Sequence, residues 1–277
     1  MSKSYSKQKA FGQNFLKDKK IIHSILDIVD LQMKKNSTKR WVEVGPGKGA
    51  LTLPFLERNP SSQLILIEKD RDLVQEWNER SISGLKVIDQ DALETDFNKI
   101  YEGETFGFFS NLPYSVGTGI FTKLALYPHR IQFMVLMFQK EVAERIRAMP
   151  STKARGSLSV WSQNAWNIEK ALIVPPHAFT PAPKVDSEVI LCTPRETPMV
   201  PESQQSPHTQ ELWQELLKTA FSHRRKMLRA IFSKNKIWTQ ALQESGIPPT
   251  LRAEALGWPE WRALFVSLLK LKPMSEK

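Results

Sequence analysis

The sequence has little cysteine and no long apolar run. Its single cysteine, Cys192, excludes an internal disulfide, and the five histidines show no metal-ligand spacing. The longest apolar stretch, 131–138, is interrupted by Gln132 and is far shorter than the ~20 residues of a membrane-spanning helix. The basic start of the chain lacks the apolar stretch of a signal sequence. These absences predict a cytoplasmic protein without metal or membrane association.

Acidic residues are scarce at both ends of the chain. Residues 1–20 contain six lysines and one aspartate, and residues 205–277 contain twelve Lys or Arg against six glutamates. These ends carry +5 and +6 of a formal net charge of +10, so the body between them is at −1. Charge concentrated in this way indicates a polyanionic partner such as a nucleic acid. A merely soluble basic protein is the alternative.

Apolar runs of strand length alternate with amphipathic helical patterns through the first two thirds of the chain. This alternation predicts an α/β domain with a largely parallel sheet. Proline, serine and glutamine dominate a later stretch that is typical of a linker, and four helical patterns follow it. We therefore predict an α/β domain over 1–195, a linker over 196–210 and a small all-helical domain over 211–277. The seven expected strands are 40–44, 63–68, 85–89, 105–110, 131–138, 168–174 and 184–191.

Three glycines follow the first expected strand. Gly45, Gly47 and Gly49 lie between the run 40–44 and a helical pattern. Glycine lets the backbone turn tightly and approach a ligand closely, and a helix N-terminus adds N–H donors. Glu68 ends the next strand, where a carboxylate can accept hydrogen bonds from both hydroxyls of a ribose. This pattern predicts a nucleoside-containing cofactor, whereas a glycine loop alone is often a simple tight turn.

The spacing of these glycines distinguishes two cofactor classes. It reads G-x-G-x-G, whereas the dinucleotide fingerprint reads G-x-G-x-x-G, and Pro46 stiffens the turn. S-adenosylmethionine is therefore favoured over a dinucleotide. Asp91 and Ala92 follow the third strand, where a carboxylate can accept from the adenine amino group and a backbone N–H can face the ring. A surface or helix-capping aspartate is the alternative.

The fourth expected strand is followed by the tetrapeptide Asn111-Leu112-Pro113-Tyr114. The exocyclic amine of adenine is a poor nucleophile because its lone pair is delocalised into the ring. The Asn111 side chain and the carbonyl of Leu112 or Pro113 can accept its two N–H bonds and localise that lone pair. Pro113 fixes the backbone, and Tyr114 offers a face for the base to stack on. The tetrapeptide therefore predicts methylation of an amine, with an ordinary Asn-Pro turn as the alternative.

Four motifs stand in order along the chain: KAFGQNFL at 9–16, EVGPG at 43–47, NLPY at 111–114 and FTPAPKVDS at 179–187. Together they resemble the ribosomal RNA small-subunit adenine dimethyltransferase family. The resemblance implies a class I S-adenosylmethionine-dependent methyltransferase fold, Rossmann-like with a seven-stranded sheet, and a C-terminal helical domain. It also implies dimethylation of two adjacent adenosines in the 3′-terminal hairpin of 16S rRNA, within the 30S particle, and a role in small-subunit biogenesis.

The resemblance also assigns roles to individual residues. Phe179 matches the aromatic that the family places near the target base, which fits a flipped adenine held between aromatic faces. A core phenylalanine is the alternative. The particle-sized substrate makes a monomer the simplest expectation. Cofactor contacts are expected at Gln13, Asn14, Leu16, Gly45, Gly47, Glu68, Asp91, Ala92 and Asn111.

The stretch 222–236 contains six cations and no acidic residue, and Arg224, Arg225, Lys226 and Arg229 are among the cations. Phosphate contacts from such a segment position an RNA without reading its sequence. We therefore predict an RNA-binding surface here. A solvated helix face is the alternative.

Three rival functions stay open. A 23S rRNA adenine dimethyltransferase of the antibiotic-resistance type shares the glycine loop and an Asn-aromatic motif, but residues 179–187 and the helical domain favour the small-subunit enzyme. A DNA adenine methyltransferase usually carries a second proline in the tetrapeptide and a separate target-recognition domain. A largely non-catalytic binding protein, such as a ribosome assembly factor or a transcription factor, would have no need of an intact Asn111, Tyr114, Glu68 and Asp91.

Overall fold

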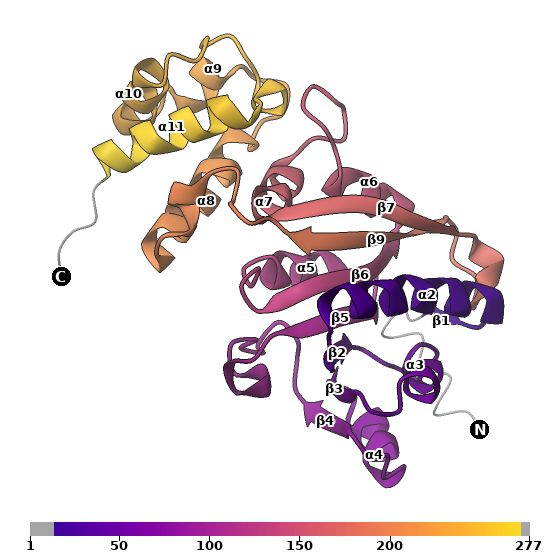
Figure 1. The fold of residues 1–277 in the computed structure, drawn as a ribbon. Helices are drawn as coiled ribbons and strands as arrows, with labels where there is room; N and C mark the ends of the chain where they lie inside the picture. The colour runs from indigo at the N-terminus through magenta and orange to yellow at the C-terminus, as the bar shows by residue number, and fades with distance from the viewer. Residues whose placement is uncertain (1–13, 273–277) are drawn as a thin grey trace. The chain divides into compact units, whose positions relative to one another are not determined.

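The computed structural model describes residues 14–272, in two compact units (Figure 1). The first unit contains residues 14–143 and 167–194, and the second contains 144–166 and 195–272. Gln13, one of the expected cofactor contacts, lies outside the described residues.

The first unit is built on a seven-stranded sheet, which confirms the predicted α/β fold. The strand order is β4-β3-β2-β5-β6-β9-β7. The pairs from β4 to β6 are parallel, and β9 joins β6 antiparallel. The strands are β2 (Arg40–Val44), β3 (Gln63–Glu68), β4 (Leu85–Asp89), β5 (Phe106–Asn111), β6 (Ile131–Gln139), β7 (Trp166–Val174) and β9 (Ser187–Pro194) (Figure 1).

The central strands are almost continuously apolar because they are buried on both faces, as is usual in parallel sheets. β3 reads QLILIE and β6 reads IQFMVLMFQ. A two-stranded antiparallel pair, β1 (Phe15–Leu16) with β8 (Phe179–Thr180), lies outside this sheet. The sequence did not predict that pair, because two residues are too few to show an alternating pattern.

Helices connect the strands of the first unit. The longest begins after Asp18, whose side chain accepts from the N–H groups of Lys20 and Ile21, as an N-cap residue does. Its apolar stripe, with Ile25 and Val29, packs in the same core as Trp41 of β2. The helices are α2 (Lys19–Asn36), α3 (Thr52–Arg58), α4 (Arg71–Glu79) and α5 (Gly117–Leu124), with a 3₁₀ turn η1 (Ile100–Gly103). A further helix, α6 (Lys140–Ile146), begins in the first unit and ends in the second.

The second unit is helical, and its core contains Trp213 and Trp261, whose rings meet edge to face at 5.9 Å. It also contains residues 144–166, which the sequence placed in the first domain. Buried hydrogen bonds explain the difference, because Asn164 accepts from the Val200 N–H and donates to Ser203, both at 2.8 Å. The elements are α7 (Ser157–Ala165), η3 (Pro201–Gln204), α8 (Pro207–Ala220), α9 (Leu228–Phe232), α10 (Lys236–Glu244), η4 (Ala253–Ala255) and α11 (Trp258–Leu271).

The stretch expected to be a linker, 196–210, is largely ordered in turns of helix. It contains η3, and α8 begins at Pro207 with Ser206 accepting from the Thr209 N–H. Proline at the first helical position is favoured because its missing N–H would have no partner there. The prolines of this stretch therefore include one that starts a helix.

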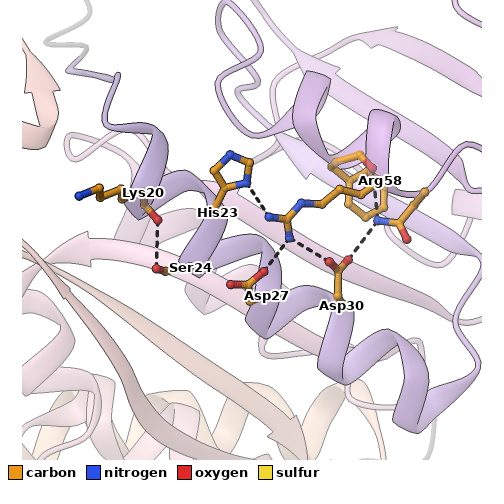
Figure 2. Close-up of polar contacts among 8 residues, drawn as sticks. Lys20, His23, Ser24, Asp27, Asp30 and Arg58 are labelled. Carbon is orange, nitrogen blue, oxygen red and sulfur yellow. Dashed lines mark hydrogen bonds and ion pairs between the residues drawn. The ribbon is translucent and has the colours of Figure 1, made fainter.

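A polar cluster joins α2 to the end of α3, the helix that follows the glycine loop (Figure 2). The Arg58 guanidinium donates to Asp27 at 2.8 Å and to Asp30 at 3.0 Å. It also lies 2.6 Å from Nδ1 of His23, and Asn59 donates to Asp30 at 3.1 Å. Because the cluster holds the last turn of α3 against α2, it supports the helix on which the glycine loop ends.

We expect Arg58→Met to lower the free energy of unfolding by about 1 kcal/mol, because the variant loses a network rather than one exposed ion pair. Urea denaturation followed by circular dichroism measures this. Arg71→Met is the matched control, since Arg71 is 89% exposed and lies 3.8 Å from Asp89. Equal stability of the two variants would contradict the structural role of the cluster.

Candidate active site

The predicted site residues gather at the carboxyl edge of the parallel strands. In the paired register, Val44 of β2 lies beside Ile67 of β3, and Glu68 lies beside Asp89 of β4. Strand order changes direction between β2 and β5. Open α/β sheets bind ligands at such a switch point, outside the carboxyl ends of the strands.

Two cavities open at this edge, and they share Gly45 and Pro113 as common walls. The larger, of about 350 Å³, is lined by the glycine loop, the tetrapeptide 111–114 and residues 14–16. The smaller, of about 60 Å³, is lined by Glu68, Asp91 and Ala92. Every described residue of the expected cofactor set lines one of the two cavities. We call them the loop cavity and the acid cavity.

The glycine loop has the backbone conformation that its composition predicts. Gly45 and Gly49 have φ of +62° and +89°, a region that favours glycine. A Cβ on Gly49 would lie 2.7 Å from the ring of Trp77, and the Trp77 Nε1–H donates to the Gly47 carbonyl at 2.9 Å. Trp77 of α4 therefore supports the loop. The sequence analysis missed it, because its amphipathic spacing looks like that of any core residue.

Glu68 lines the acid cavity and has a buried carboxylate group. Its side chain is 5% exposed, and Oε1 accepts from the N–H groups of Lys69 and Asp70 at 2.9 and 3.0 Å. Oε2 is buried without a hydrogen-bond partner among the described residues. Burial raises the pKa of Glu68, while the surrounding N–H groups lower it. A buried oxygen of this kind needs a donor, and the hydroxyls of a ribose would supply one.

Asp91 makes the capping contact of one interpretation and lines the cavity that the other requires. Oδ1 accepts from the Leu93 N–H at 2.9 Å, which is the turn-capping role. Oδ2 lies 3.6 Å from Nζ of Lys69 and the residue lines the acid cavity next to Ala92. A carboxylate has several lone-pair sites, so it retains capacity to accept from an adenine amino group.

Glu43 is a buried acid in the wall of the loop cavity that the sequence analysis did not single out. Thr52 donates to its Oε2 at 2.7 Å. Burial raises the pKa of Glu43 to about 8, against the lowering effect of the Thr52 hydrogen bond, and the nearby Glu68 raises it further. The EVGPG motif contained this residue, but the motif alone does not show that its carboxyl group is buried.

The tetrapeptide 111–114 begins at the last residue of β5 and continues into a closed turn. The Pro113 carbonyl accepts from the Gly117 N–H at 2.8 Å, Leu112 is buried, and Asn111 and Tyr114 line the loop cavity. The Tyr114 hydroxyl lies 2.5 Å from Oγ of Ser187. Burial raises the pKa of Tyr114, and the hydrogen bond to Ser187 lowers it. Asn111, which is expected to contact the target amine, and Tyr114, which is expected to contact the ring of the base, thus line the same cavity.

Phe179 occupies a different place from these residues. Its side chain is 1% exposed and packs in the core of the first unit, where it pairs with Leu16 across β1 and β8. It does not line the loop cavity or the acid cavity. The structure therefore shows the core phenylalanine of the alternative interpretation, and stacking on the target base stays a prediction.

The four predicted RNA-binding cations of the second unit differ in their contacts. Arg224 donates to the carbonyls of Lys153 and Arg155 at 2.5 and 2.9 Å and lies 3.8 Å from Glu254. Arg225, Lys226 and Arg229 are exposed. Arg224 thus holds the loop before α7, whereas the other three point their charge to solvent.

Comparisons with known proteins extend these observations. A family model described as ribosomal RNA adenine dimethylase matches residues 4–265. The chain belongs to this family. A relative named ribosomal RNA small subunit methyltransferase A, from Cronobacter sakazakii, is 39% identical over 89% of this chain and 88% of the relative. One of the same name from Thiobacillus denitrificans is 37% identical over 94% and 97%.

Solved structures match the fold of this chain over most of its length. A dimethyladenosine transferase from Plasmodium falciparum has a TM-score of 0.71 at 24% identity, covering 93% of this chain and 98% of the other. The 23S rRNA methyltransferase ErmE has a TM-score of 0.62 at 22% identity, covering 92% and 99%. Family membership makes the chain an S-adenosylmethionine-dependent rRNA methyltransferase, and the acceptors and cavities above fit that cofactor.

No helix in 14–272 combines the length and apolar character needed to cross a membrane. In the same residues, His, Cys, Asp and Glu side chains form no group of three that could hold a metal ion.

We expect Glu68→Gln to raise the Kd for S-adenosylmethionine by about tenfold or more, because an acceptor for ribose hydroxyls loses its charge. Isothermal titration calorimetry measures this. Glu57→Gln, an exposed glutamate of α3, is the control. Unchanged affinity in Glu68→Gln would place the ribose elsewhere.

We expect the stability of the first unit to fall as pH rises from 5 to 8, because Glu43 has a folded-state pKa of about 8, above its usual 4.5. Over that range the folded chain holds a proton that the unfolded chain has lost, so each pH unit lowers the free energy of unfolding by up to about 1.4 kcal/mol. Glu43→Gln should lack this contribution. Urea denaturation of both proteins at several pH values tests it, and parallel pH profiles would refute it.

Proposed function

We propose that this chain dimethylates the N6 amines of two adjacent adenosines in the 3′-terminal hairpin of 16S rRNA, acting as a monomer on the 30S particle in the cytoplasm. The observation that carries the proposal is the shared wall of the two cavities. Gly45 and Pro113 line both, so the acids expected to hold the nucleoside of the cofactor lie beside the tetrapeptide expected to hold an adenine amine.

The reaction needs positioning more than proton transfer. When bound, S-adenosylmethionine would supply the methyl group, and its methyl–sulfur bond would break to leave S-adenosylhomocysteine. Asn111 and the carbonyl of Leu112 or Pro113 accept the two N–H bonds of the target amine and localise its lone pair for the new C–N bond. The amine then loses a proton to water after the methyl group has arrived. Tyr114 holds the ring by stacking. The catalytic gain comes from orientation and from acceptors that are already in place.

The choice of 16S rRNA rests on the sequence relatives. Proteins at 37–39% identity are named small subunit methyltransferases, whereas ErmE, named for 23S rRNA, matches at 22% identity and supports only the fold. Residues 179–187 support the small-subunit substrate further. The helical second unit does not distinguish the two substrates, because the match to ErmE covers 92% of this chain. A role in subunit biogenesis follows if the second unit docks on an immature particle.

Docking is assigned to the exposed cations of the second unit. Arg225, Lys226 and Arg229 carry charge to solvent, and the stretch 222–236 contains no acid. Contacts of this kind supply affinity and orientation without reading sequence. Arg224 contributes by holding the loop at Lys153 and Arg155.

We expect Asn111→Ala to reduce methyl transfer to unmethylated 30S particles by at least ~10²-fold, the scale of one preorganised polar group. Transfer of radiolabelled methyl followed by nucleoside analysis measures it. Wild-type protein should yield dimethyladenosine in 16S rRNA alone, and 50S particles serve as the parallel substrate. Near-normal turnover by the variant would refute the role of Asn111, and label in 23S rRNA would refute the proposed substrate.

We expect Arg225→Gln with Lys226→Gln to flatten the salt dependence of particle binding, reducing the slope of log K against log salt by about 1.5 to 2. Lys86→Gln with Lys170→Gln removes the same charge from exposed positions of the first unit and is the control. Filter binding at several salt concentrations compares them. The same slope in both double variants would move the RNA surface elsewhere.

A further inference from the structure

The hydroxyl of Tyr114 is held by a residue that comes from another part of the chain. Its oxygen lies 2.5 Å from Oγ of Ser187, the first residue of β9. Ser187 is fully buried, whereas Tyr114 is half-buried and lines the loop cavity. Among the described residues, this is the hydrogen bond that the Ser187 hydroxyl makes. One end of an aromatic ring at the site is thus fixed from β9.

The backbone at both ends of this contact is set independently of it. The turn that carries Tyr114 is closed by N–H groups of Val116 and Gly117, which donate to the Pro113 carbonyl at 3.2 and 2.8 Å. Ser187 pairs with Gln139 in the register of β6 and β9. The backbone carbonyl of the preceding residue, Asp186, accepts from the Lys140 N–H at 2.9 Å. The two hydroxyls are therefore presented to each other by fixed backbone, and their bond fixes the ring.

We propose that Ser187 is a positioning residue for methyl transfer, which holds the Tyr114 ring so that its face stays open to the target base. The proposal rests on the proposed function, in which Tyr114 stacks on adenine. A ring fixed at the Cα end alone would sample other rotamers, and ordering it on binding would cost free energy. The FTPAPKVDS segment thus contributes its last residue to the site, while its first, Phe179, packs in the core.

A double-mutant cycle of Ser187→Ala and Tyr114→Phe tests the coupling. Each variant removes one hydroxyl and keeps the tyrosine or phenylalanine ring. We expect each single variant to lower kcat about threefold to tenfold, the range for one hydrogen bond. The double variant should be no slower than either single one, because the two hydroxyls act as one unit. The Kd values for S-adenosylmethionine and for the particle should stay unchanged. If kcat of the double variant falls by the product of the two single fold-losses, the hydroxyls act independently and the proposal is overturned.

Thr38→Val is the matched control. The Thr38 side chain is buried and donates to Gln132 at 2.7 Å, before the amino end of β2 and so away from the cavities. The Thr38→Val variant therefore loses a buried hydrogen bond comparable to that of Ser187, in the same unit. We expect its kcat to equal that of the wild type. A loss as large as that of Ser187→Ala would show a general effect of destabilisation and would overturn the proposal.

A readout without methyl transfer separates this inference from the proposed function. The chain has four tyrosines, so selective ¹³C labelling gives a simple spectrum, and Tyr114→Phe assigns its signal. We expect Ser187→Ala to shift the Tyr114 ring signal, and Thr38→Val to leave it in place. An unshifted signal would overturn the role of Ser187. Failure of the wild-type protein to methylate 30S particles would instead contradict the proposed function, whatever the spectrum shows.

Discussion

Parallel pairing of β2, β3, β4 and β5 is the constraint on which the rest of the site depends. Because these strands run in one direction, the residues that follow them gather at one edge of the sheet. The glycine loop, Glu68, Asp91 and Asn111 are far apart in the chain but line two adjoining cavities. Apolar residues on both faces of the strands stabilise this pairing, so the packing of the core positions the residues that line the cavities.

Much of this arrangement is predictable from sequence because its signals are local. The apolar runs of β3 and β6 predict buried strands. The glycine loop that begins at Gly45, followed by Glu68 at the end of the next strand, predicts a binding site for a nucleoside-containing cofactor. Asn111 and Tyr114 are found by the same reasoning, since a polar tetrapeptide follows a buried strand. The described residues of the predicted cofactor set all line the cavities, although their contacts with ligands are proposals.

What the sequence does not predict depends on contacts between distant residues. Trp77 supports the glycine loop and Ser187 holds Tyr114, yet each has the local pattern of an ordinary core or strand residue. Asn164 binds the chain near Val200, which places 144–166 in the second unit rather than the first. Phe179 has the motif of a stacking residue but packs in the core, because the pairing of β1 with β8 buries it.

The most direct test of this geometry is a crystal structure of the chain with S-adenosylmethionine and a short RNA that contains adenosine. The structure described here predicts ribose hydroxyls on Glu68, the adenine of the cofactor at Asp91 and Ala92, and the methyl group facing a target N6 held by Asn111. A cofactor outside the two cavities, or a target amine out of reach of Asn111, would contradict it.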